Sequence, residues 1–213
     1  MIEKYLEFEQ DGVKYNLYDM PKGFVVKGDL DLSNKGLTEL PDLSEVVIEG
    51  SFDCSENELT SLKGAPQKVG EYFCCYANQL TDLEGAPQEV GGDFYCYVNK
   101  LMTLEGAPKE IGGCFSCVAN QELKSLFKIP KMNEDEKLYC DSELAKKYDL
   151  PDVECAISNL YASQVYQNEV AIDKLRRQKG QERAKAQEQA TNKVRKLFAA
   201  WQAQQAQKDG PEK

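Results

Sequence analysis

The eight cysteines of this chain have the potential for soft-metal or redox chemistry. Four of them recur every 21 residues, at Cys54, Cys75, Cys96 and Cys117. Thiols stacked at a constant spacing could bind a soft metal ion, but a small, weakly polar side chain also suits a narrow apolar interior. Only Cys114 and Cys117 have the spacing of a zinc-binding pair, and no second pair follows, so we expect packing. Cys74 and Cys114 lie outside the series and are expected at the surface.

Histidine is absent from the chain, which removes the commonest general base and metal ligand. Neither a phosphate-binding Gly-Lys-Ser/Thr loop nor a dinucleotide-binding glycine motif occurs in the sequence. Acidic residues are plentiful but do not form a recognisable catalytic pair. We therefore expect a protein that is not an enzyme and that uses no cofactor and no metal.

An internal repeat of 21 residues is the strongest pattern in the sequence. Phenylalanine and asparagine follow the same period as cysteine, at Phe52, Phe73, Phe94 and Phe115 and at Asn57, Asn78, Asn99 and Asn120. In each unit Phe-x-Cys alternates as a strand does, so both side chains are expected to point inward. The leucines that follow close the same interior, and Gly-Ala-Pro turns the chain back. Stacked units would share one core, and the asparagine would satisfy backbone groups at the turn.

The segments Asn57–Leu62 and Asn78–Leu83 read Asn-x-Leu-Thr-x-Leu, which resembles the bacterial Leu-Pro-x class of leucine-rich repeats. The Gly-Ala-Pro-x-x-Val-Gly-Gly form is also similar to uncharacterised repeat proteins of bacteria and bacteriophages. The resemblance covers residues 28–141 and implies a curved, leucine-rich-repeat-like solenoid with parallel strands on its concave face and a binding role. Diverged units at residues 30–34 and 138–140 extend the stack to about six rungs.

Different elements are expected at the two ends of the stack, which gives an α+β fold class. Residues 1–27 predict a β-hairpin cap, because two alternating segments flank Asp11-Gly12. Residues 142–206 predict a helical segment, with a short helix from Ser142 and a long helical extension from 152 onward. Residues 207–213 predict a disordered tail.

The charge of the chain is uneven, which indicates two physically different modules. Residues 1–140 hold 13 lysines, no arginine and 25 acidic residues, and all four arginines lie between 176 and 195. The basic segment could contact a partner or form a solvated helix face. Its candidate contact residues are Arg176, Arg177, Arg183, Phe198 and Trp201.

The outward strand positions are the best candidates for a binding surface. They include Asp53, Tyr72, Cys74, Tyr76, Asp93, Tyr95, Tyr97 and Ser116. Exposed aromatic side chains clustered on a rigid surface are typical of protein interfaces, and the two aspartates favour a partner with a basic patch. The alternative is a solvated sheet face on which tyrosine supports strand pairing.

Three functional hypotheses follow from these patterns. The first is a protein-interaction module, phage-encoded and directed at a host protein, which binds through the concave Tyr/Asp face and the C-terminal helix. The second is a structural or virion component that self-associates through residues 152–206. Nucleic-acid binding by the basic helix ranks third, because the acidic solenoid would repel phosphate. No signal peptide and no apolar run of membrane-spanning length occur, so a cytoplasmic location is expected.

Overall fold

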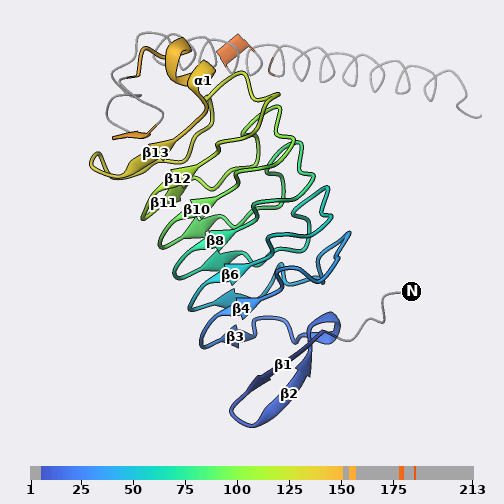
Figure 1. Ribbon diagram of the computed structural model, residues 1–213. Coiled ribbons are helices and arrows are strands. Elements are labelled where there is room, and N and C mark those ends of the chain that lie inside the picture. The colour runs from blue at the N-terminus through green and yellow to red at the C-terminus, as the bar shows by residue number, and fades with distance from the viewer. Residues whose placement is uncertain (1–5, 151–153, 157–177, 180–184, 186–213) are drawn as a thin grey trace, which may run out of the picture. The chain divides into compact units, whose positions relative to one another are not determined.

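The computed structural model describes residues 6–150, 154–156, 178, 179 and 185. Within them the chain winds into a parallel-strand β-solenoid of about five turns, preceded by an antiparallel hairpin (Figure 1). The predicted parallel repeat fold and the N-terminal hairpin are therefore confirmed. None of the described helices is long and apolar enough to cross a membrane.

Each turn of the solenoid contributes two short strands, and these stack into two sheets. In the described residues the first sheet contains five parallel strands: β3 (Val25–Val26), β5 (Val47–Ile48), β7 (Lys68–Val69), β9 (Glu89–Val90) and β11 (Glu110–Ile111). The second contains β4 (Leu30–Asp31), β6 (Phe52–Asp53), β8 (Phe73–Cys74), β10 (Phe94–Tyr95), β12 (Phe115–Ser116), β13 (Lys137–Tyr139) and β14 (Glu154–Ala156). The sequence predicted only the second sheet as strands, whereas the valine and isoleucine of the return side also pair. Since β3 is already part of the stack, the first solenoid strand precedes the predicted start at residue 28.

The interior is built from ladders of identical side chains, because equivalent residues of successive turns lie in register. The repeated phenylalanines are fully buried and stack face to face, with 5.1 Å between the ring centroids of Phe73 and Phe94. The four repeated cysteines are fully buried beside them. Burial of apolar surface supplies about 1.5–3 kcal/mol for a large side chain, and no single turn could bury its own apolar face. The inward orientation predicted for Phe and Cys is confirmed.

The repeated asparagines tie each turn to the one before it, as predicted. The side-chain amide of Asn78 donates to Cys75 O and Tyr76 O of its own turn and to Cys54 O of the preceding turn. Its Oδ1 accepts the backbone N–H of Leu59 at 3.0 Å. The residue before each asparagine has left-handed backbone, as at Val98 with a φ of 53°, which turns the chain out of the strand.

Glycine forms the corner between the two sheets, where successive turns approach most closely. A Cβ placed on Gly91 would collide with the backbone carbonyl oxygen of Gly70 in the turn below. The same relation holds one turn higher for Gly112 and Gly91. The recurring Val-Gly pair of the sequence is therefore a packing requirement of the corner.

The hairpin at the N-terminal end consists of β1 (Glu7–Gln10) and β2 (Val13–Asn16), joined through Asp11 and Gly12, both with positive φ. A 3₁₀ helix, η1 (Leu17–Asp19), follows it. The rings of Phe8, Tyr15 and Phe24 pack together, with 4.7 Å between the centroids of Tyr15 and Phe24. The hairpin thus packs against the first turn through this aromatic cluster.

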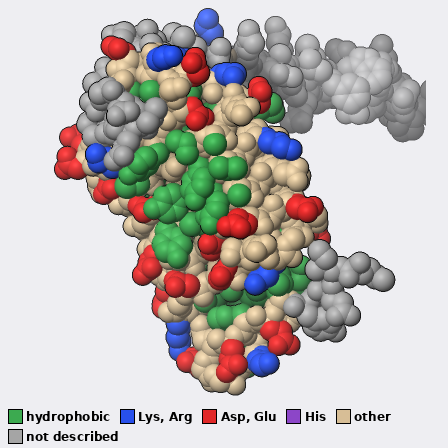
Figure 2. All heavy atoms as spheres, in the orientation of Figure 1, with side chains coloured by type: hydrophobic (Ala, Val, Ile, Leu, Met, Phe, Trp, Pro, Cys, Tyr) green, Lys and Arg blue, Asp and Glu red, His purple; other side chains and the backbone are tan. Residues whose placement is uncertain are grey.

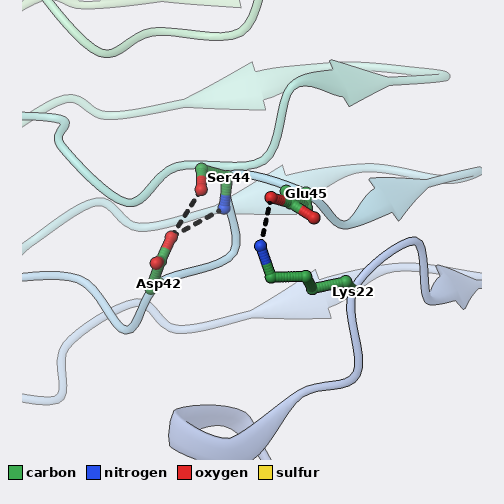
Figure 3. A network of polar contacts seen from close by, with 4 residues as sticks. All are labelled: Lys22, Asp42, Ser44 and Glu45. Atoms are coloured by element: carbon green, nitrogen blue, oxygen red, sulfur yellow. Dashed lines mark hydrogen bonds and ion pairs between the residues drawn. The ribbon is translucent and has the colours of Figure 1, made fainter.

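Exposed polar contacts join the first two turns beside the hairpin (Figure 3). Lys22 forms an ion pair with Glu45 at 2.7 Å, and Asp42 accepts from the hydroxyl and the backbone N–H of Ser44. The hydrogen bond and the charge of Glu45 raise the pKa of Lys22. These groups are solvated, so we assign them to local turn geometry.

The last turn is closed by α1 (Ser142–Lys147), which begins at the predicted residue. Tyr148 directly after it is fully buried, and its hydroxyl accepts the backbone N–H of Leu126 at 2.9 Å. The long helix expected from residue 152 is wrong at β14, which pairs antiparallel with β13. An unpaired solenoid edge would leave a row of backbone groups without partners, and this requirement overrides the helical spacing there. Further along the predicted segment, Gln178, Lys179 and Lys185 are helical. The rest of that prediction, and the predicted tail, lie outside the described residues.

Candidate binding face

The outward side chains of the second sheet form one surface, here called the tyrosine face. It consists of the outward positions of β4, β6, β8, β10 and β12 and their flanks: Asp29, Asp31, Ser33, Ser51, Asp53, Ser55, Tyr72, Cys74, Tyr76, Asp93, Tyr95, Tyr97, Cys114, Ser116 and Val118. Strand pairing in register places these residues in columns along the stack. Hydrophobic side chains gather over the middle strands, and acidic side chains border them (Figure 2).

The four predicted tyrosines lie together on two neighbouring turns. Tyr76 and Tyr97 stack with 4.5 Å between ring centroids and 6° between ring planes, and Tyr95 meets Tyr97 edge-on at 6.3 Å. Tyr72 is 40 % exposed, and the other three are half-buried. The structure therefore places the four tyrosines on adjacent turns, with the rings of Tyr76, Tyr95 and Tyr97 in contact.

Carboxylates hold two of the phenol groups in place. The Tyr95 hydroxyl donates to Asp93 at 2.5 Å, and the Tyr76 hydroxyl donates to Glu56 at 3.3 Å. The hydrogen bond to Asp93, with partial burial, raises the pKa of Tyr95 well above its usual value. Burial also raises the pKa of Tyr97. Both rings thus stay neutral at physiological pH, with polarisable faces and a polar rim.

The small residues of the face are buried rather than exposed, which corrects several predictions. Cys74 is 6 % exposed and Ser116 is 7 % exposed. In the register, Cys74 lies between Asp53 of β6 and Tyr95 of β10, so larger neighbours cover it. This burial, with the nearby charges of Asp53 and Asp93, raises the pKa of Cys74 to about 12. Cys114 is half-buried, and it remains the more accessible thiol of the two.

Two further serines predicted to point outward are also covered. Ser51 is buried, and its hydroxyl donates to Glu71 at 3.1 Å. Ser55 is fully buried, and its Oγ is the only buried side-chain polar atom without a partner among the described residues. The exposed part of the candidate face is therefore narrower than predicted, and consists of the tyrosines and the carboxylates.

The two predicted aspartates of the face differ in their surroundings. Asp93 is fully engaged, because it accepts both the Tyr95 hydroxyl and the backbone N–H of Cys114, the latter at 2.7 Å. Asp53 uses Oδ1 to accept the backbone N–H of Ser55 at 2.9 Å. Its other oxygen has no contact with a cation among the described residues.

Sequence reasoning missed Asp31, which extends the acidic side of the face by one turn. It accepts the hydroxyl and the backbone N–H of Ser33, and these hydrogen bonds lower its pKa. The signal was present, because residues 30–34 had been recognised as an earlier rung. Extending the outward alternation into that rung would have identified it.

The cysteine ladder contains protonated, buried thiols. The Cys54 Sγ donates to Cys74 O, and the Cys96 Sγ donates to Ser116 O, each at 3.3 Å. Burial raises the pKa of Cys54, Cys75 and Cys117 well above the usual thiol value. In the described part of the chain no group of three or more metal-ligating side chains is arranged around a common point.

Hollows in the described surface also lie away from the tyrosine face. One of about 540 Å³ lies on the first sheet, between the lysines and glutamates of β7, β9 and β11. Another of about 680 Å³ lies beside η1 and is lined by Thr38, Asp42 and Thr60. These hollows are open to solvent, and we assign no chemistry to them.

The basic candidates Arg176, Arg177, Arg183, Phe198 and Trp201 lie outside the described residues, so their role stays a prediction. Comparisons of the chain with protein-family models, with curated proteins and with solved structures give no match. The resemblance to leucine-rich repeats thus also stays a prediction, and the function is argued from the tyrosine face alone.

Proposed function

We propose that this chain is a protein-interaction module that binds its partner through the tyrosine face. The observation that carries the proposal is the cluster of Tyr72, Tyr76, Tyr95 and Tyr97 on two adjacent turns of a rigid sheet. Tyrosine provides large contact area at a low cost in conformational entropy, and it is enriched among residues that dominate binding energy. Ring contacts and hydrogen bonds to Asp93 and Glu56 hold Tyr76, Tyr95 and Tyr97 in place before a partner arrives.

The chemistry of the surface favours binding over catalysis. The chain contains no histidine, and the thiols of its interior ladder are buried and protonated. On the tyrosine face the ionisable groups are hydrogen-bonded to the protein's own backbone and phenols. Such an arrangement preorganises a surface, and a preorganised surface gains affinity because little ordering is needed on association.

The test is a quantitative affinity purification from lysate of the source organism, with the full chain as bait. The wild type is compared with a chain carrying Tyr76→Ala and Tyr97→Ala, and with Met102→Ala as matched control. Met102 is 60 % exposed and does not belong to the tyrosine face. Partners retained by the wild type and the control, and lost with the double variant, would support the proposal.

A conservative variant separates the loss of contact area from damage to the fold. Tyr76→Phe with Tyr97→Phe keeps both rings and removes only the hydroxyls. We expect this chain to retain most of the partner recovered by the wild type, because the rings supply most of the buried area. Equal recovery of every protein by the wild type and the double alanine variant, with both chains folded by circular dichroism, would refute the proposal.

A further inference from the structure

The tyrosine face changes in character along the stack. At the N-terminal end, β4 and β6 present Asp31 and Asp53 in register. The middle strands present the tyrosines, and β12 presents the half-exposed Val118 and Cys114. The surface therefore changes from acidic, through tyrosines with Asp93 among them, to small side chains at the last turn, where the Cys114 thiol donates to Glu136 at 3.7 Å.

The carboxylates at the acidic end form no ion pair within the described structure, although the charge of Lys35 contributes to the lowered pKa of Asp31. Neither Asp31 nor Asp53 forms an ion pair with a described lysine or arginine, and the outward positions from β4 to β12 contain no basic residue. On the first sheet, by contrast, acids and bases alternate and pair, as in Lys68 with Glu89 at 2.8 Å and Lys131 with Glu110 at 3.2 Å. The absence of basic residues is thus particular to the tyrosine face.

Ser55 marks the same end of the face. It follows Asp53 by two residues, and its hydroxyl is buried without a hydrogen-bond partner in the described structure. Buried polar atoms are nearly always satisfied in folded proteins. The Ser55 hydroxyl is inaccessible from outside, so the groups that can meet a partner at this end are the carboxylates of the exposed Asp31 and the half-buried Asp53.

We propose that the tyrosine face binds an amphipathic protein segment laid along the stack, with its arginine or lysine side chains at Asp31 and Asp53 and its apolar side chains over Tyr97 and Val118. This inference rests on the proposed function and adds the chemistry and the polarity of the partner. Cations are attracted both by carboxylates and by the faces of tyrosine rings. Four strand spacings of about 4.8 Å separate β4 from β12, so an extended segment of about six residues spans the face.

The experiment uses the full chain and labelled synthetic peptides of about ten residues, with binding measured by fluorescence anisotropy. In one pair of peptides a block of arginines is joined to a block of leucines, in either order. A third peptide alternates arginine and leucine. A second pair of block peptides, again in either order, has glutamate in place of arginine. We expect one block order to bind more tightly than the alternating peptide, and we expect no binding of the glutamate forms.

Matched variants locate the cation. Asp31→Asn with Asp53→Asn removes two charges while it keeps the Oδ1 acceptors of the Ser33 and Ser55 backbone N–H groups. Glu39→Gln with Glu58→Gln removes two charges from exposed side chains outside the face. The first variant should bind the preferred block peptide about two- to thirty-fold more weakly, because two exposed ion pairs of ordinary strength are lost. The second should leave the affinity unchanged.

Two results would overturn the inference: neither block peptide binds, or the block peptides bind equally well to the two charge variants. Suppose that recovery of a partner depends on Tyr76 and Tyr97 but does not change with Asp31→Asn and Asp53→Asn. The proposed function would then stand, and only the proposal that the partner places cations at these aspartates would fail. Loss of tyrosine dependence would instead remove the proposed function itself. The two failures are therefore distinguishable.

Discussion

Replacing Asn78 by alanine tests whether the asparagine ladder holds the turns together. The three carbonyl groups that receive the Asn78 amide each keep a second donor: Asn57 for Cys54, Asn99 for Cys75 and the Glu56 N–H for Tyr76. The buried N–H of Leu59 is bonded to the Asn78 Oδ1 alone among the contacts described for it. An orphaned buried N–H costs about 1–3 kcal/mol and each lost hydrogen bond about 1 kcal/mol, so we expect a loss of ~4 kcal/mol.

This loss is large against the total stability of a chain of this size, since about 0.05–0.15 kcal/mol per residue is typical. At about 2–4 °C per kcal/mol, the melting temperature should fall by ~8–16 °C. Urea and thermal denaturation followed by far-ultraviolet circular dichroism measure both quantities. The control is Gln79→Ala, at the exposed neighbouring position, which should change stability by no more than ~0.5 kcal/mol.

Asn78→Asp should make the free energy of unfolding depend on pH through this position. One carboxyl oxygen still accepts the Leu59 N–H, but the other faces carbonyl oxygens and must carry a proton to donate. The folded state therefore raises the pKa of this carboxyl, and the variant approaches the wild type only below the ordinary aspartate value of about 3.9. Its deficit relative to the wild type should grow as pH rises above that value. A pH-independent deficit, or an alanine variant within ~1 kcal/mol of the wild type, would refute the reasoning.

Four other substitutions or reactions test single features. Val98→Asn should stabilise the fold by ~1 kcal/mol in urea denaturation, because the wild-type valine is β-branched and has a left-handed φ of 53°, which asparagine adopts more readily. An unchanged midpoint would contradict this. Ser55→Ala should be neutral or stabilising by up to ~1 kcal/mol, since it removes an unsatisfied hydroxyl; a clear destabilisation would show that the hydroxyl has a partner. Gly91→Ala should lower the melting temperature by several degrees, roughly as expected for a steric clash of 1–3 kcal/mol, and a silent change would disprove the close approach. Iodoacetamide with peptide mass mapping should modify Cys114 before Cys74, and Cys74 should gain reactivity only as pH approaches its pKa of about 12; the reverse order would refute the assignment of burial.

The repeat made the interior predictable, because identical residues at a constant period must occupy equivalent positions. Phe73, Cys75 and Asn78 lie where the alternation and the turn placed them. The first sheet was harder to recognise, because each of its strands contributes only one inward apolar residue, such as Val69 or Val90. A single residue per turn carries no alternation from which a strand can be read.

Exposure on the tyrosine face could not be derived from alternation alone. Alternation gives the side of the sheet, and Cys74 and Ser116 do lie on the outward columns. Their burial depends on the size of neighbours one turn away, such as Tyr95, which are distant in the sequence. The strand at Glu154–Ala156 was missed for a related reason: the edge of β13 imposes pairing on a segment whose own spacing favours a helix.

The asparagine ladder also favours changes in chain length that add or remove whole repeats. In the regular repeats each amide bridges two turns at the same offset, so inserting or deleting one residue between two successive asparagines would shift the bridge across that turn. Deleting a whole period, such as residues 73–93, would instead bring β6 beside β10, with Phe on Phe and Asn in its usual place. Such a protein gains or loses entire rows of its surface by duplication or deletion of 21 residues, and its interior needs no compensating change.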